Sequence, residues 1–204
     1  MYEVFLNRTS IRPGETLLDV GVTSDQTYDS SNYVEAWYPY KDKITAVGID
    51  DASFLERQYP GLRYRRADGR NLPFKDASFD VVHSSAVLEH VGSAENQRSF
   101  IAELTRVASR AVFITTPNRW FPVEFHSVLP LVHWLPRPWF RGLLRGTRYE
   151  FFAREENLNL VDRKDIMQLC SGLHECVVSV ESLRLLGMPS NLLVTIRKQA
   201  MSNA

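Results

Sequence analysis

The sequence predicts an α/β domain built around a mainly parallel β-sheet. Short apolar and β-branched runs alternate with segments of helical periodicity, which is the pattern of repeated βαβ units. The chain has 204 residues, of which 44% are hydrophobic and 24% charged, and this fits one globular domain with a buried core. The last two apolar runs are joined by a short link and not by a helix, so we expect a closing antiparallel hairpin.

Five apolar runs in the first part of the chain are expected to be strands. They occupy residues 16–20, 44–49, 62–66, 79–83 and 111–115. Two closing strands are expected at residues 176–180 and 192–196, with residues 187–191 between them. The turn Pro13-Gly14 precedes the first strand, and Pro60-Gly61 ends a short helix before the third.

Two amphipathic helices can be placed from their first residues. Ser93 is a good N-cap for a helix in which Phe100 and Leu104 share one face. A second helix is expected to begin at Asp162 and to end near Gly172. Because few residues precede the first strand, a helix before that strand is expected to be reduced or absent.

The composition limits which binding partners and which cellular compartment are expected. The chain has 24 basic and 24 acidic residues, so no global field favours nucleic acid, and none is expected as a partner. The two cysteines, Cys170 and Cys176, lack the spacing of a zinc knuckle and are expected to be reduced thiols. No signal peptide and no apolar stretch of ~20 residues is found. A cytoplasmic location is therefore expected.

Acidic residues and glycines follow the first three expected strands. A nucleoside cofactor in an open α/β sheet binds outside the carboxyl ends of the strands. Asp19 and Gly21 lie at the first of these ends, Asp50 at the second, and Asp68 with Gly69 at the third. The two carboxylate oxygens of Asp50 could accept both hydroxyls of a ribose. A solvated strand-end carboxylate or a helix cap is the alternative for Asp50.

Residues 68–91 carry the most specific pattern. An acid-glycine pair, Asp68-Gly69, is followed by Leu72-Pro73-Phe74, by the strand Phe79-Asp80-Val81-Val82 and by Leu88-Glu89-His90-Val91. This order resembles the middle of class I S-adenosylmethionine-dependent methyltransferases, in particular the type 11 branch. The resemblance extends from about Thr16 to Lys198. It implies a Rossmann-like, mainly parallel seven-stranded sheet with helices on both faces and an antiparallel last strand.

The resemblance also implies an activity and a cofactor. The chain would be an enzyme that transfers a methyl group from S-adenosylmethionine to a small molecule, a sugar or a lipid-linked acceptor. In the family, the acid at the position of Asp68 accepts the adenine amine, and the next backbone amide, at Gly69, contacts the adenine ring. Ser84, after the fourth strand, would line the cofactor beneath the transferred methyl.

The glycine loop departs from the family pattern. The family has Asp-x-Gly-x-Gly-x-Gly, but this chain has Thr23 and Asp25 where two of the glycines are expected. The following loop, residues 25–32, is polar. Either its side chains replace backbone amides around the methionine carboxylate, or this end of the site has decayed. A dinucleotide site fits less well, because that fingerprint needs the missing glycines and does not share the 68–82 pattern.

An insertion rich in aromatic residues and proline is expected at about residues 118–148 of a single domain, 1–204. In the family, insertions at this place build the substrate side of the pocket. Three interpretations stay open: a lid over an apolar or carbohydrate acceptor, a peripheral membrane contact, and an ordinary packed loop. Arg141, Arg145 and Arg148 would share one face of a helix, which suits an anionic lipid or phosphate.

His126 and His90 are the candidate catalytic residues. A hydroxyl acceptor must lose a proton, and imidazole is a base near neutral pH. His126 is the first choice because its segment belongs to the insertion, with Glu124 nearby to orient the ring. No histidine pair has helical i, i+4 spacing or a neighbouring cysteine, so no metal site is predicted. The alternative function is a non-catalytic module of the same fold that acts through its aromatic insertion.

Overall fold

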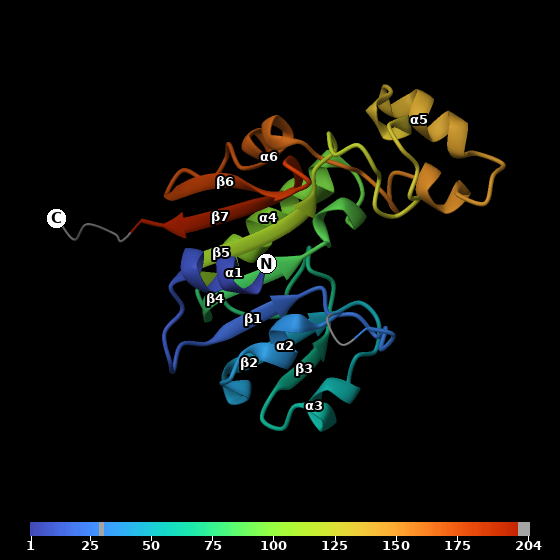
Figure 1. Ribbon diagram of the computed structural model, residues 1–204. Coiled ribbons are helices and arrows are strands. Elements are labelled where there is room, and N and C mark those ends of the chain that lie inside the picture. The colour runs from blue at the N-terminus through green and yellow to red at the C-terminus, as the bar shows by residue number, and fades with distance from the viewer. Residues whose placement is uncertain (29–30, 200–204) are drawn as a thin grey trace.

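The computed structural model describes residues 1–28 and 31–199, and its strands form one seven-stranded sheet (Figure 1). The strands are β1 (Leu17–Val20), β2 (Ile44–Gly48), β3 (Arg63–Arg66), β4 (Phe79–Ser85), β5 (Ala108–Pro117), β6 (Cys176–Leu185) and β7 (Met188–Lys198). Their order is β3-β2-β1-β4-β5-β7-β6. Strands β1 to β5 pair in parallel, whereas β7 is antiparallel to both β5 and β6.

The seven expected strands and the Rossmann-like arrangement are therefore confirmed. The main difference is that the closing hairpin is longer and tighter than expected. Strands β6 and β7 continue to Leu185 and from Met188, which leaves Leu186 and Gly187 as the turn. Both turn residues have positive φ, 51° and 79°, as in the type I′ turns whose twist matches that of a hairpin.

Six α-helices are found among the described residues. They are α1 (Tyr2–Thr9), α2 (Tyr33–Trp37), α3 (Phe54–Gln58), α4 (Ala94–Val107), α5 (Arg137–Leu144) and α6 (Arg163–Leu169). Short 3-10 helices are η1 (Lys41–Lys43), η2 (Leu88–His90), η3 (Val132–Trp134) and η4 (Glu150–Ala153). The predicted caps are confirmed. Ser93 accepts a hydrogen bond from the Asn96 amide, and Asp162 forms a capping box with Asp165.

The helix that was expected to be reduced or absent before the first strand is present as the short α1, and it is held by Phe5, which is fully buried against the sheet. The connection from β3 to β4, residues 67–78, contains turns and no helix. Its Leu72-Pro73-Phe74 segment packs Leu72 into the core and Phe74 against its edge.

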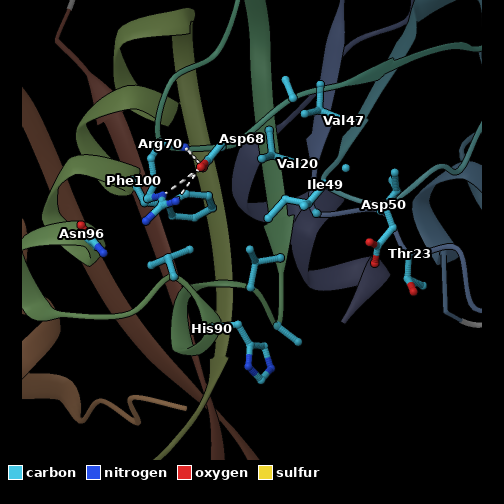
Figure 2. Close-up of a pocket in the computed structure, with 18 of the residues that line it drawn as sticks. Val20, Thr23, Val47, Ile49, Asp50, Asp68, Arg70, His90, Asn96 and Phe100 are labelled. Atoms are coloured by element: carbon cyan, nitrogen blue, oxygen red, sulfur yellow. Dashed lines mark hydrogen bonds and ion pairs between the residues drawn. The ribbon is translucent and has the colours of Figure 1, made fainter. Parts of the chain in front are cut away.

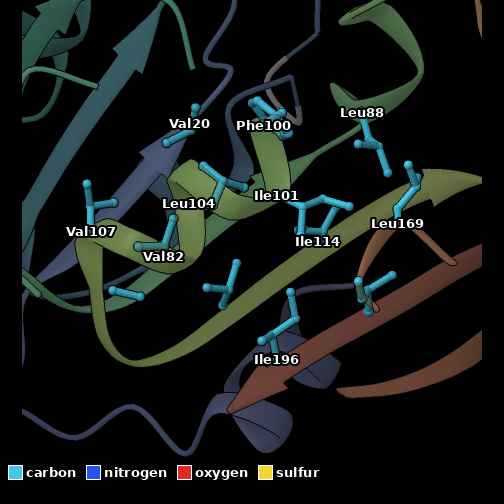
Figure 3. Packing of buried hydrophobic residues seen from close by; sticks show 14 of the residues in the cluster. Val20, Val82, Leu88, Phe100, Ile101, Leu104, Val107, Ile114, Leu169 and Ile196 are labelled. Atoms are coloured by element: carbon cyan, nitrogen blue, oxygen red, sulfur yellow. The ribbon is translucent and has the colours of Figure 1, made fainter. Parts of the chain in front are cut away.

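The sheet has a hydrophobic core on each face because neighbouring strand residues point in opposite directions. Leu18 and Val82 lie on the face covered by α4 and α6, together with Phe100 and Leu104 of α4 (Figure 3). Leu17 and Val81 lie on the other face, with Phe5 of α1, Val34 of α2 and Leu55 of α3. The sheet is thus covered by helices on both sides, and the open carboxyl ends of its strands are left to form a site.

The aromatic insertion continues past the expected residue 148 to about residue 160 and builds a third, smaller core. Its buried members are Phe140, Leu144, Ala153, Leu158 and Leu160. This lobe, with α5, projects beyond the sheet in Figure 1. A β-bridge between Asn118 and Val161 marks where the chain leaves the sheet and returns to it. Among the described residues, no helix combines the length and the apolar character that spanning a membrane requires.

Candidate functional site

A pocket of about 360 Å³ opens at the carboxyl ends of β1, β2 and β3 (Figure 2). Gly21, Asp50, Asp68, Gly69 and His90, all singled out from the sequence, line it. The remaining walls come mainly from apolar side chains on these strands and from Phe100 on α4. In Figure 2, His90 lies at one end of the pocket, away from Asp68 and Arg70. The topology therefore brings together strand ends that are far apart in the sequence.

Gly21 and Gly69 allow close packing beneath the pocket. A Cβ on Gly21 would lie 2.0 Å from Cγ2 of Val87, and its φ of +108° is one that side chains rarely adopt. A Cβ on Gly69 would lie 2.4 Å from Cε2 of Phe100. Both positions thus require glycine so that the backbone can form the wall of the pocket.

The two strand-end carboxylates differ in their partners. The Asp50 side chain is exposed at the pocket and makes no hydrogen bond or ion pair within the described part of the chain. The Asp68 carboxylate is paired with the Arg70 guanidinium, which lowers the pKa of Asp68 through its hydrogen bond. Asp50 is therefore free to accept hydrogen bonds, whereas Asp68 is a carboxylate that already has a partner.

The loop after Gly21 is held together by its own side chains. The Thr23 amide donates to Oδ1 of Asn32 at 3.0 Å, and the Asp25 amide donates to Oγ1 of Thr23. The Thr27 amide donates to Oδ1 of Asp25 at 2.8 Å. These amides are already engaged, so the loop does not offer the open backbone of a glycine-rich turn. Residues 29 and 30 of the predicted polar loop lie outside the described residues.

Asp19 and Ser84 do not line the pocket, although direct contact with the cofactor was expected of both. The Asp19 carboxylate lies 2.6 Å from Nδ1 of His83, on the sheet face that carries Leu17. The Ser84 hydroxyl donates to the carbonyl of Val20 at 2.7 Å and is fully buried. The physical reason for Asp19 is strand alternation, because the residue two after Leu17 points to the same face.

A buried polar cluster surrounds Asp19. Nε2 of His83 lies 2.7 Å from the hydroxyl of Tyr33, and the carboxyl of Glu35 is close by. Burial raises the pKa of Asp19 to about 7 and lowers the pKa of His83 to about 4. Burial and the neighbouring Asp19 also raise the pKa of Glu35 well above its usual range. Only the alternation of residues in β1 and β4 could have indicated this cluster from the sequence.

The two candidate catalytic histidines meet at the edge of the pocket. The rings of His90 and His126 have centroids 4.7 Å apart and are nearly perpendicular. Nδ1 of His126 lies 2.6 Å from Oε1 of Glu124, as expected if Glu124 orients the ring. His126 does not line the pocket itself, but His90 does. The insertion therefore contacts the wall of the pocket through this pair.

The hydrogen bonds of Glu124 shift the pKa values of Glu124 and His126 in opposite directions. Burial alone would raise the pKa of Glu124, but hydrogen bonds from His126 and Ser127 lower it to about 2. Burial alone would lower the pKa of His126, but the hydrogen bond with Glu124 and the nearby carboxylates raise it. Glu124 is thus a carboxylate at all ordinary pH values.

Sequence reasoning missed Glu89, which lies beside the histidine pair. Glu89 is fully buried, and its Oε2 accepts a hydrogen bond from the Thr116 hydroxyl at 2.9 Å. Its Oε1 has no hydrogen-bonding partner among the described residues and lies 4.0 Å from Nε2 of His90. The available signal was that Glu89 directly precedes His90, a candidate catalytic residue, in a segment that also contains the apolar Leu88 and Val91.

Known proteins resemble the chain in sequence over part of its length. Residues 25–114 match the family model described as a methyltransferase domain. A demethylmenaquinone methyltransferase of Beutenbergia cavernae is 31% identical over 127 residues, 58% of this chain and 48% of that protein. A probable S-adenosylmethionine-dependent methyltransferase of Mycobacterium tuberculosis is 33% identical over 81 residues, 38% of this chain and 28% of that protein. The chain thus spans about half or less of the length of these relatives.

Solved structures resemble the chain over nearly its whole length, at low identity. The YcgJ protein of Bacillus subtilis superposes with a TM-score of 0.64 at 12% identity, covering 97% of each chain. A magnesium protoporphyrin IX methyltransferase of Synechocystis, solved with bound S-adenosylhomocysteine, gives 0.59 at 15% identity. It covers 96% of this chain and 80% of that chain. These structures share the fold described above.

Proposed function

Because the chain belongs to the class I S-adenosylmethionine-dependent methyltransferases, we propose that it binds S-adenosylmethionine and transfers its methyl group to an acceptor. The observation that carries the proposal is the pocket at the ends of β1 to β3, where Asp50 and Asp68 face one cavity. Gly21 and Gly69 form parts of the wall where a Cβ would collide with Val87 and Phe100, respectively. The two carboxylate acceptors and the close approach of the backbone fit a nucleoside ligand.

Each pocket residue has a distinct part in holding the cofactor. Asp50 accepts the two ribose hydroxyls with its two unpartnered oxygens. Asp68 accepts the adenine amine, while the amide that follows it, at Gly69, faces the ring. Gly21 lets the backbone approach the methionine end. Asp19 and Ser84 do not touch the ligand. They connect β1 to β4 through their contacts with His83 and with the Val20 carbonyl.

The protein's contribution to the reaction is alignment. Bound S-adenosylmethionine supplies an electrophilic methyl group. The chain's own residues hold the acceptor atom in line with that group and keep water out, and such alignment is worth ~7–11 kcal/mol. No covalent intermediate with the protein is required.

The insertion forms the acceptor side of a single domain and favours an apolar or lipid-linked acceptor. Large apolar side chains are exposed along it. Among them are Trp120, Phe125, Val128, Leu131, Trp139 and Phe151. The name of the Beutenbergia relative refers to demethylmenaquinone, a quinone, which is consistent with an apolar acceptor. The expected shared helix face of Arg141, Arg145 and Arg148 is not formed, because α5 ends at Leu144 and Arg141 is paired with Glu155. The exposed apolar side chains still suit a peripheral membrane contact from which a lipid-linked acceptor would be taken.

For the acceptor's proton, His126 is the first choice and His90 the second. His126 is on the insertion, its ring is oriented by Glu124, and it packs against His90 at the end of the pocket. This arrangement of base and orienting carboxylate is the one that general-base catalysis needs.

Calorimetric titration with S-adenosylhomocysteine tests the proposal. We expect saturable binding at one site per chain, and weaker binding by an Asp50→Ala variant. The engaged amides of the loop at Thr23 to Thr27 favour the second candidate, a non-catalytic module of the same fold. Absence of heat and of any thermal shift at millimolar ligand would contradict cofactor binding and support that module.

A further inference from the structure

Three side chains converge between the cofactor pocket and the insertion. One ligand atom from each of Glu89, His90 and His126 lies within 4.8 Å of the other two. Glu89 and His90 come from η2, directly after β4, whereas His126 comes from the insertion. The cluster exists only because the insertion folds back over the end of β4.

The hydrogen bonds of the two histidines fix which nitrogen is available. Nδ1 of His90 lies 2.7 Å from the carbonyl oxygen of Asn157, which can only accept, so this nitrogen carries the proton. Nδ1 of His126 donates in the same way to the carboxylate of Glu124. In the neutral rings, both Nε2 atoms then present lone pairs. A histidine held by its other nitrogen on a carboxylate or carbonyl is the usual arrangement of metal-ligating histidines.

Glu89 gives the cluster a buried acceptor with no partner. It is fully buried, Thr116 satisfies only Oε2, and Oε1 is left without a hydrogen bond among the described residues. Such an atom is costly to bury unless a donor or a cation compensates it. Oε1 lies 4.0 Å from Nε2 of His90, and Glu89 contributes one of the three converging ligand atoms.

We propose that Nε2 of His90, Nε2 of His126 and the Glu89 carboxylate bind a divalent transition-metal ion such as Zn²⁺. Two imidazoles and one carboxylate are a known ligand set for Zn²⁺, and three protein ligands leave a position open. Imidazole nitrogen disfavours Mg²⁺ and Ca²⁺, which prefer oxygen. A tetrahedral ion with bonds of ~2.0–2.1 Å separates its ligands by ~3.3 Å, so the atoms must approach by about 1 Å. The two histidines are partly exposed and can rotate to do so.

The position of this site suggests what the ion does. His90 lines the cofactor pocket and His126 lies on the acceptor side, so the open position faces the place where both substrates meet. This step rests on the proposed function. The ion would hold an acceptor through oxygen and make its hydroxyl more acidic, in place of His126 acting as a free base.

Binding of Co²⁺ and Zn²⁺ tests the site without reference to methyl transfer. After dialysis against a chelator, we expect one Co²⁺ per chain, with visible absorption bands that Zn²⁺ removes. His126→Ala and Glu89→Gln should each weaken Zn²⁺ binding ~100-fold or more, and Glu124→Gln, which loosens the ring of His126, ~10–100-fold. His174→Ala removes an exposed histidine elsewhere and should leave the affinity unchanged.

Folding of each variant is checked by thermal melting without metal. His126 is partly exposed, so His126→Ala keeps the test valid should the buried Glu89→Gln fail to fold. Zn²⁺ affinity that is the same in His126→Ala, His90→Ala and the wild type would overturn the proposal. Titration with S-adenosylhomocysteine reports separately on the proposed function, because Asp50 and Asp68 are not ligands of the ion.

Discussion

Nη2 of Arg70 lies 2.6 Å from Oδ2 of Asp68 at the pocket that we assign to the cofactor (Figure 2). Nε of Arg70 contacts both oxygens of the same carboxylate, at 3.0 and 3.1 Å. An adenine amine that binds to Asp68 therefore competes with Arg70. The ion pair is about two-fifths exposed on each side, so its free energy is small, up to ~1 kcal/mol.

Arg70→Ala should strengthen cofactor binding, by up to ~5-fold, because the competing partner of Asp68 is removed. Asp68→Ala should weaken it, because the acceptor for the adenine amine is lost. Calorimetry with S-adenosylhomocysteine measures both changes. Weaker binding by Arg70→Ala would show that the guanidinium itself contacts the cofactor, contrary to our expectation.

Asp50→Ala should weaken cofactor binding by at least ~10-fold. It removes two charge-assisted hydrogen bonds to the ribose, each worth roughly 1.5–3 kcal/mol. The neighbouring Asp51 provides a matched control, because its Oδ1 accepts the Ser53 amide at the start of α3 and it does not line the pocket. Equal losses of affinity in Asp50→Ala and Asp51→Ala would point to a general effect on the loop and would remove Asp50 from the site.

Gly69→Ala should destabilise the fold by ~1–3 kcal/mol. The new Cβ would lie 2.4 Å from Cε2 of Phe100 and 2.9 Å from Cγ1 of Val20, and both side chains are buried and cannot move away. Urea denaturation measures the change. Gly142→Ala, on α5 with open space around it, is the control and should be neutral or slightly stabilising. Unchanged stability in Gly69→Ala would mean that the pocket wall can yield.

The sequence predicted the sheet well because its signal is local. Each strand is a short apolar run, and Asp50 and Asp68 follow two of them directly, so their arrival at one edge follows from parallel pairing alone. The same alternation could have placed Asp19 on the inner face with Leu17, but the resemblance to a family motif outweighed it. The family motif thus predicted a cofactor contact for Asp19, whereas strand alternation places its side chain beside His83 and away from the pocket.

The cluster of Glu89, His90 and His126 was out of reach of the sequence. His90 and His126 were chosen separately as bases, and neither spacing nor composition indicated that they touch. Their contact depends on the path of the insertion, which is fixed by long-range bonds such as that of His90 to Asn157. Metal sites read from sequence rely on ligands at short, regular spacing, and this cluster has one ligand from a distant segment.

The buried carboxyl of Glu35 leads to a prediction about stability and pH. Neither of its oxygens has a hydrogen-bonding partner among the described residues, and burial together with Asp19 raises its pKa well above the usual range. The folded state then keeps a proton that the unfolded chain loses above pH ~4–5. This contribution to the free energy of unfolding is complete at lower pH and is lost as the pH rises through the folded-state pKa.

Between pH 7 and 8.5, the wild-type melting temperature should therefore fall, and Glu35→Gln should fall less. Asp19 affects stability in the same direction as Glu35, because burial raises its pKa to about 7. It therefore adds to the loss of stability near pH 7, at the lower end of this pH range. His83 affects stability in the opposite direction, since burial lowers its pKa to about 4. Its effect on stability is therefore confined to pH below ~6.5.

The test compares melting curves of the wild type, Glu35→Gln and Glu3→Gln, the last removing an exposed carboxylate on α1. From pH 7 to 8.5, the stability of Glu35→Gln relative to the wild type should grow by up to ~1.4 kcal/mol per pH unit while folded Glu35 keeps its proton, and the difference should level off above the folded-state pKa. Titrating groups remote from Glu35 cancel in the difference, whereas Asp19, whose pKa is linked to that of Glu35, does not. Parallel curves for all three would show that Glu35 is already ionised in the folded state across this range, contrary to our expectation.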